Sequence, residues 1–117
     1  MVSGLTEEIK ACIIGAEPVE VSYPEKGYHY ALETSPDKLP AVVGFFDEKR
    51  FTLECLLCTD YTDTLELVYF FNTPLSPCRV KVTLKIDPRQ PVAPSVSAIY
   101  SSAYWYEREI HAFYGVL

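Results

Sequence analysis

The sequence is poor in basic residues and in glycine. Ten lysines and arginines stand against sixteen aspartates and glutamates, which gives a net charge of −6. Binding to nucleic acid needs a basic face, so a nucleic-acid partner is not expected. Glycine occurs only five times, with neither a G-x-G-x-x-G fingerprint nor a P-loop. A self-contained nucleotide site is therefore not expected either.

Long apolar runs are missing as well. The apolar stretches are only a few residues long, which is too short for a membrane span. The opening segment, MVSGLTEEIKACII, lacks the basic region and long apolar stretch of a signal peptide. We therefore expect a cytoplasmic protein, and in that compartment the four cysteines are expected to be reduced.

The chain is nevertheless rich enough in apolar residues to build a core. Hydrophobic residues make up 49% of its 117 residues, and aromatic residues make up 14%. A globular chain of this size buries roughly two-thirds of the surface that its unfolded form exposes. We therefore expect a single domain over residues 1–117, with some aromatic rings left over for a contact surface.

Hydrophobic periodicity predicts three helices and four strands. The helices are expected over residues 5–16, from about Asp37 to Lys49, and in the C-terminal segment 104–115. In the first of them, one face carries Leu5, Ile9, Cys12, Ile13 and Ala16. The strands are expected at VEVSY (19–23), FTLECLL (51–57), LELVYFFN (65–72) and CRVKVTLKID (78–87). Alternation predicts that one face of the strand carries the apolar residues: Val19, Val21 and Tyr23 in the first strand, Phe51, Leu53, Cys55 and Leu57 in the second, and Val80, Val82, Leu84 and Ile86 in the last. This order predicts an α+β fold in two layers, with helices packed on one face of a mainly antiparallel sheet.

Cys55 and Cys58 form a C-x-x-C motif, the spacing of many redox and zinc sites. They fall in a predicted strand, where residues three apart point to opposite faces, so the thiols are not expected to converge. A metal site would need Cys12 or Cys78 to join them. We interpret the pair as buried or half-buried cysteines, and the alternative is a free-standing small redox or metal-binding protein that uses them.

His29 and His111 are the only two histidines. No nucleophile elbow and no known cysteine signature surrounds any Cys, so a Cys–His nucleophilic pair has no support in the sequence. We interpret both histidines as exposed or hydrogen-bonded side chains, and we expect no catalytic, cofactor or metal site on this chain.

The segment YWYEREIHAFYG, Tyr104–Gly115, is dense in aromatic and charged residues. Helical spacing places Tyr106, Ile110, Phe113 and Tyr114 on one face, Tyr104, Glu107, Arg108 and His111 on another, and Trp105, Glu109 and Ala112 along a third edge. Glu107 and Glu109 do not face each other, so they do not form a catalytic carboxylate pair. The segment is either a core helix with a solvated face or a docking element, since Trp, Tyr and Arg dominate interface energies.

The C-terminal segment AIYSSAYWYEREIHAFYGV resembles the signature of the 30-kDa subunit of respiratory complex I, also known as the C subunit of NADH-quinone oxidoreductase. The matching positions are Ala103, Trp105, Tyr106, Glu107, Arg108, Glu109, Gly115 and Val116, with Pro94, Ser95, Asp60, Tyr61 and Tyr69 upstream. The sequence departs from the family at Tyr104, Ala112 and Tyr114, and Ser101 or Ser102 must cap the helix in place of the family's Asn. It stops at Leu117, before the family's Gly-His-Pro segment and tail.

The short chain resembles the versions of this subunit in energy-converting [NiFe] hydrogenases of the carbon-monoxide-induced, Ech and formate-hydrogenlyase types. The resemblance implies a non-catalytic accessory subunit without cluster or flavin, peripheral on the cytoplasmic side of the membrane. Its implied partners are a hydrogenase-like or quinone-reductase large subunit and a small iron–sulfur subunit, with membrane association only through the complex. The partner-interface candidates are Tyr104, Trp105, Tyr106, Glu107, Arg108, Glu109 and His111.

Overall fold

A computed structural model describes residues 9, 18–21, 23–73 and 78–116. The elements in chain order are β1 (Val19–Glu20), α2 (Tyr23–Lys26), β2 (Tyr30–Thr34), α3 (Leu39–Glu48), β3 (Thr52–Asp60), β4 (Leu65–Thr73), β5 (Cys78–Ile86) and α4 (Ala103–Tyr114). The helix predicted over residues 5–16 lies outside the described residues, except for Ile9, which is fully buried.

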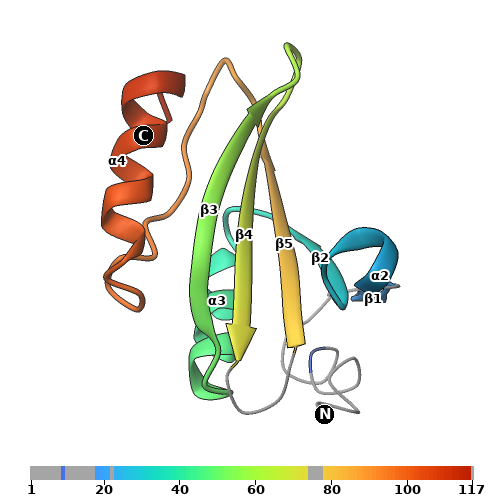
Figure 1. Cartoon of the computed structure of the whole chain (residues 1–117). Coiled ribbons are helices and arrows are strands. Elements are labelled where there is room, and N and C mark those ends of the chain that lie inside the picture. The colour runs from blue at the N-terminus through green and yellow to red at the C-terminus, as the bar shows by residue number, and fades with distance from the viewer. Residues whose placement is uncertain (1–8, 10–17, 22, 74–77, 117) are drawn as a thin grey trace.

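The strands form one five-stranded sheet in the order β1-β2-β5-β4-β3 (Figure 1). The pairs β1–β2, β3–β4 and β4–β5 are antiparallel, whereas β2 and β5 run parallel. The mainly antiparallel sheet of the prediction is therefore confirmed. The prediction missed β2, a five-residue strand that begins three residues after Gly27.

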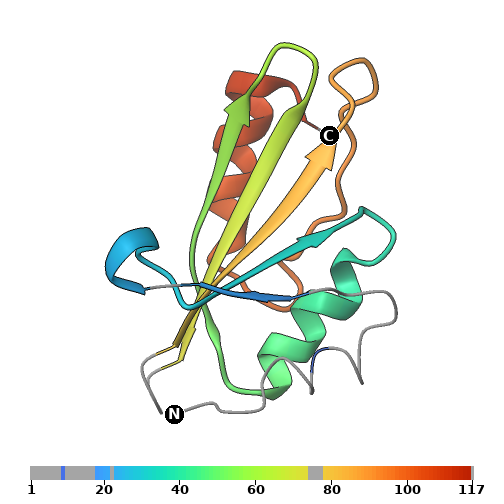
Figure 2. The same ribbon diagram turned by 90° about the vertical axis from the view of Figure 1, so that its right-hand side faces the viewer.

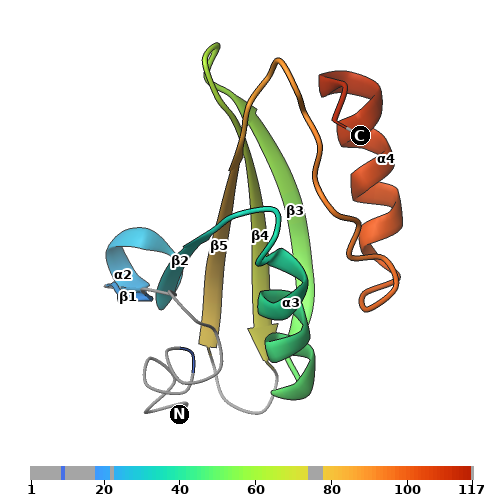
Figure 3. The same ribbon diagram turned by 180° about the vertical axis from the view of Figure 1, so that it is seen from behind.

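The two long helices cover one face of the sheet and give the predicted two layers. Phe46 of α3 stacks on Phe71 of β4 with ring centroids 4.9 Å apart. Ile110 of α4 joins the same core cluster, together with Leu67 and Tyr69 of β4. Along the strands, α4 covers one half of this face and α3 the other half (Figures 1 and 3). Viewed from the opposite face, α4 lies behind the sheet (Figure 2).

Strict alternation sets the core face of β5, where Val80, Val82 and Leu84 are fully buried, as predicted. In β3 the predicted alternation is wrong beyond Leu53. The register shifts between Leu53 and Cys55, because a bulge places one extra residue in the strand. After the bulge Leu56 is buried, whereas Leu57, which the prediction placed on the core face, is 52% exposed.

The predicted strand over residues 19–23 is also only partly right. It ends after Glu20, and Val19 and Tyr23, predicted to face the core, are 56% and 50% exposed. Tyr23 begins the short helix α2, and Pro24 at its start fits the fixed backbone angle of a first helical turn. Gly27, with φ of +81°, ends this helix in a left-handed conformation that suits glycine.

Candidate functional site: the outer face of the terminal helix

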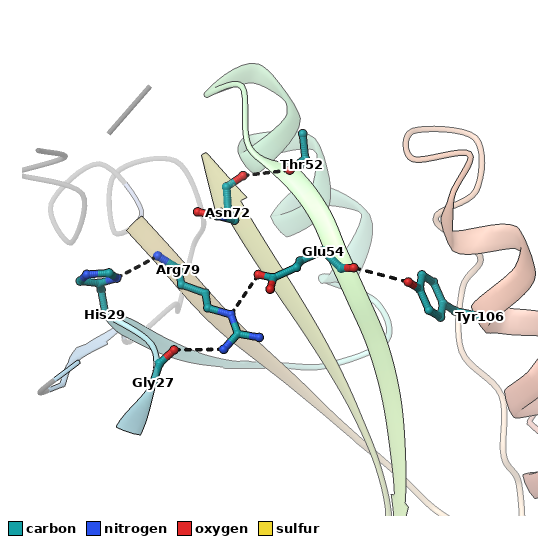
Figure 4. Close-up of polar contacts among 7 residues, drawn as sticks. All are labelled: Gly27, His29, Thr52, Glu54, Asn72, Arg79 and Tyr106. Atoms are coloured by element: carbon teal, nitrogen blue, oxygen red, sulfur yellow. Dashed lines mark hydrogen bonds and ion pairs between the residues drawn. The ribbon is translucent and has the colours of Figure 1, made fainter. Parts of the chain in front are cut away.

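The terminal helix α4 is held by a small number of well-defined contacts. Ile110 is 7% exposed and packs into the core, and Tyr106 packs against the same cluster. The Tyr106 hydroxyl donates a hydrogen bond of 3.4 Å to the Glu54 carbonyl of β3 (Figure 4). Ser102 occupies the position before the helix but makes no capping hydrogen bond, so the predicted serine cap is not seen there. The side chains of Phe113 and Tyr114, predicted for the apolar face, lie outside the described residues.

Glu107 ties α4 to the segment that leads into it. Its carboxylate accepts 2.7 Å and 2.8 Å hydrogen bonds, from the Ser95 hydroxyl and from the backbone N–H of Val96. Hydrogen bonds to an ionised acceptor are stronger than neutral ones, so this clamp fixes the helix against residues 95–96. Glu109 is exposed on a different side of the helix. The two acids are therefore not a pair, in agreement with the helical spacing.

Tyr104, Trp105 and Arg108 form an exposed cluster, here called the aromatic–arginine surface. Trp105 is 64% exposed and Tyr104 is 49% exposed. Their rings meet edge to face with centroids 5.4 Å apart. The guanidinium carbon of Arg108 lies 5.5 Å from the Trp105 ring centroid and 5.6 Å from that of Tyr104. These cation–π contacts follow from the three- and four-residue spacing, and they hold a cation at the surface in one place.

The ring of His111, near the end of α4, makes a hydrogen bond to the backbone. Its Nδ1 lies 2.8 Å from the backbone carbonyl oxygen of Val116. A carbonyl oxygen can only accept, so Nδ1 carries the proton in this contact. The other histidine, His29, accepts a 3.0 Å hydrogen bond at Nδ1 from the backbone N–H of Arg79 (Figure 4). Both histidines are hydrogen-bonded, which confirms that interpretation.

A cavity of about 460 Å³ lies between α4, the connecting segment before it and the sheet, and we call it the α4 cavity. Leu56, Leu67 and Tyr69 of the sheet line it, and so do Pro94, Glu107 and Ile110. Tyr104 and Arg108 also line it, so the aromatic–arginine surface adjoins the cavity. Sequence periodicity placed Tyr69 in a strand but gave no sign of the cavity, because the alternation of a strand does not show where a cavity borders the sheet.

The C-x-x-C thiols diverge in the sheet. Cys55 pairs with Phe70 and Cys58 with Leu67, and these two partners lie on opposite faces of β4. Burial raises the pKa of both thiols, which is the opposite of what a reactive thiol needs. Among the described residues, no group of three or more His, Cys, Asp or Glu side chains could hold a metal ion.

A polar cluster on the other side of the sheet centres on Arg79 of β5, which the sequence did not single out. Its Nε donates a 2.9 Å hydrogen bond to the Glu54 carboxylate, and its Nη1 donates one of 3.0 Å to the Gly27 carbonyl (Figure 4). The guanidinium also lies over the Phe70 ring, 4.2 Å from its centroid. These contacts join β3, β5 and the turn before β2, so we assign the cluster a structural role.

The structure is a two-layer α+β domain whose terminal helix exposes a cluster of two aromatic rings and one arginine. Residues 32–117 match the family model of the respiratory-chain NADH dehydrogenase 30-kDa subunit. The chain belongs to this family, as the resemblance predicted. Within the described residues, no helix is long and apolar enough to cross a membrane.

Curated relatives agree with the family assignment. The NADH-quinone oxidoreductase C subunit of Azorhizobium caulinodans is 30% identical over 119 residues, covering 95% of this chain and 56% of that protein. The corresponding protein of Sinorhizobium medicae is 34% identical over 127 residues, covering 100% of this chain and 58% of the relative. The chain thus spans little more than half the length of these relatives.

Solved structures share the fold. A chain in the structure of the membrane-bound sulfane sulfur reductase, an archaeal respiratory membrane complex, superposes with a TM-score of 0.83 at 24% identity. The match covers 97% of this chain and 67% of that chain. The trypsin-resistant fragment (1–134) of Nqo5 superposes with a TM-score of 0.79 at 17% identity, covering 97% of this chain and 91% of the fragment.

Proposed function

We propose that this chain is a non-catalytic accessory subunit of a multisubunit, membrane-associated oxidoreductase, either an energy-converting [NiFe] hydrogenase or an NADH-quinone oxidoreductase. Its role is to support assembly and stability of the hydrogenase-like large subunit, beside a small iron–sulfur subunit. It carries no cofactor of its own and lies peripherally on the cytoplasmic side of the membrane. Family membership supports the class of complex, and the relatives' names supply the quinone-reductase branch.

The observation that carries the proposal is the aromatic–arginine surface. A Trp side chain that is 64% exposed, with an arginine against its ring, buries little apolar surface in the isolated domain and stabilises it only slightly. Trp, Tyr and Arg are the residues that most often supply the binding energy of a protein interface. The same three side chains stand in the segment that carries the family signature, so we place the contact with the large subunit there.

Replacing Arg108 tests this proposal. Arg108→Ala removes an exposed side chain and its cation–π contacts, so the free energy of unfolding of the isolated chain should fall by no more than about 1 kcal/mol. Retention of the co-expressed large subunit on the tagged chain should fall about tenfold or more, because a central interface arginine is lost. Both effects are measured by chemical denaturation and by quantitative co-purification.

Arg89→Ala is the matched control. Arg89 is another exposed arginine, paired with Asp87 at 3.1 Å in the loop after β5, away from the aromatic–arginine surface. This variant should retain the large subunit as the wild-type chain does. Equal retention by both variants and wild type would show that the large subunit does not dock at Arg108.

A further inference from the structure

Tyr69 carries a hydroxyl group that the described part of the chain leaves without a hydrogen-bond partner. The residue is 1% exposed and lines the α4 cavity. Every fully enclosed side-chain oxygen or nitrogen among the described residues has a partner. The Tyr69 hydroxyl therefore touches open space, and the open space that Tyr69 lines is the α4 cavity. The hydroxyl of this buried tyrosine thus forms part of the cavity wall.

This hydroxyl meets the open space of the cavity, so among the described residues it makes no hydrogen bond that would stabilise the free domain. Packing alone would favour phenylalanine at this position, as at Phe71 two residues further along the same face of β4. Burial, with a smaller effect from the Glu107 carboxylate, raises the pKa of Tyr69, so the group stays protonated and can donate. The cavity therefore offers a phenol donor beside the apolar side chains of Leu56, Leu67 and Ile110, and its polar lining also includes Ser95, Ser97 and His111.

The rest of the lining sets the shape and chemistry of an occupant. Leu56, Leu67, Pro94 and Ile110 supply apolar walls. A volume of about 460 Å³ is in the range that accommodates a bound group the size of a side chain or small ligand. An occupant that fits has an apolar body and brings a hydrogen-bond acceptor, such as a carbonyl oxygen, to the phenol.

We infer that the α4 cavity is an anchor pocket for one large apolar side chain of the partner protein, whose segment presents a carbonyl oxygen to the Tyr69 hydroxyl. This inference rests on the proposed function. Its basis is continuity, because Tyr104 and Arg108 belong both to the aromatic–arginine surface and to the cavity lining. A partner segment seated on that surface passes the mouth of the cavity, and binding hot spots are typically side chains that fill such pockets.

The variant Tyr69→Phe tests whether the Tyr69 hydroxyl binds the partner protein or serves only the fold. Removal of an unpartnered hydroxyl should leave the melting temperature of the isolated chain unchanged or raise it. The same change should weaken retention of the co-expressed large subunit about two- to tenfold, the equivalent of one hydrogen bond. A lower melting temperature with unchanged retention would overturn the inference, because the hydroxyl would then serve the fold alone.

Filling the cavity gives a second, independent test. Ala93 lines the α4 cavity, whereas Ala98 is exposed in the same connecting segment and does not line it. Ala93→Phe should reduce retention of the large subunit at least tenfold, and the matched control Ala98→Phe should retain it as wild type does. Melting temperatures check that both variants fold. Full retention by a folded Ala93→Phe chain would show that no partner side chain enters the cavity.

The two proposals can fail separately. If Arg108→Ala weakens the complex while Tyr69→Phe and Ala93→Phe do not, the docking surface stands and the anchor pocket is wrong. If none of the three variants weakens the complex, both the docking surface and the anchor pocket are wrong.

Discussion

Cys78 is the most deeply buried of the described cysteines. It begins β5 opposite Thr73 of β4 and is 2% exposed. Burial raises the pKa of its thiol from the ordinary value of 9.0 to about 11, because a thiolate is poorly solvated in the core. The thiol therefore behaves as a small apolar group of the sheet rather than as a nucleophile.

This shift predicts how stability depends on alkaline pH. The folded state holds the proton more tightly than the unfolded state, so the stabilising contribution is fully present below pH 9 and is lost as the pH rises to about 11. Over that interval the wild-type free energy of unfolding should fall by about 1–2 kcal/mol more than that of Cys78→Ala, because one pKa unit corresponds to roughly 1.4 kcal/mol. Urea denaturation under reducing conditions measures both chains, and parallel declines would contradict the prediction.

Residue spacing predicted part of the site and left another part open. Helical geometry placed Arg108 on the same side as Tyr104 and separated Glu107 from Glu109, and the structure agrees. The partners of Glu107 come from residues 95–96, more than ten positions upstream. Only the path of the connecting segment brings them to the carboxylate, so local spacing could not predict this clamp.

At the scale of elements, the attachment of α4 depends on Glu107. Glu107→Ala removes the acceptor for Ser95 and Val96 and should lower the free energy of unfolding by about 1–3 kcal/mol, the usual range for hydrogen bonds to a charged group. Glu109→Ala, at an exposed position of the same helix, should change it by less than about 0.5 kcal/mol. Equal effects in thermal or chemical denaturation would mean that the clamp contributes nothing.

The junction of β3, β5 and the turn before β2 depends on Arg79. Arg79→Met keeps much of the aliphatic side chain but removes the bonds to Glu54 and Gly27, and we expect a loss of about 1–2 kcal/mol in unfolding free energy. Lys85→Met is the control, because its 3.1 Å ion pair with Glu33 is well exposed and such pairs contribute little. Urea denaturation compares the two, and a larger loss for the Lys85 variant would contradict the structural role of Arg79.

The bounds of the elements show where local pattern suffices. The bounds of the strand β5 and the helix α3 agree with the prediction to within two residues at each end, because each keeps one period over its whole length. The strand β3 was predicted with the wrong face after Leu53, since a bulge reverses the alternation without a signature in the residues themselves. The strand β2 was missed. It is short, and it pairs in parallel with β5, which follows β3 and β4 in the chain, so no local pattern indicates this pairing.

At the scale of the whole molecule, the fold is set by the pattern of burial rather than by particular residues. A structure only 17% identical superposes over 97% of this chain with a TM-score of 0.79. The apolar faces of the strands and of the two long helices are enough to close one core between two layers.

The sequence by itself determined the α+β class, most of the helices and strands, the separation of the two glutamates and the family, because spacing, periodicity and a contiguous motif are local properties of a chain. Only the tertiary structure decided that β2 joins β5 in parallel, that Glu107 clamps the connecting segment, and that Tyr69 ends at a cavity shared with Arg108. These features depend on which distant segments meet. They arise from packing α4 and its connecting segment over the sheet, and no residue periodicity encodes that contact.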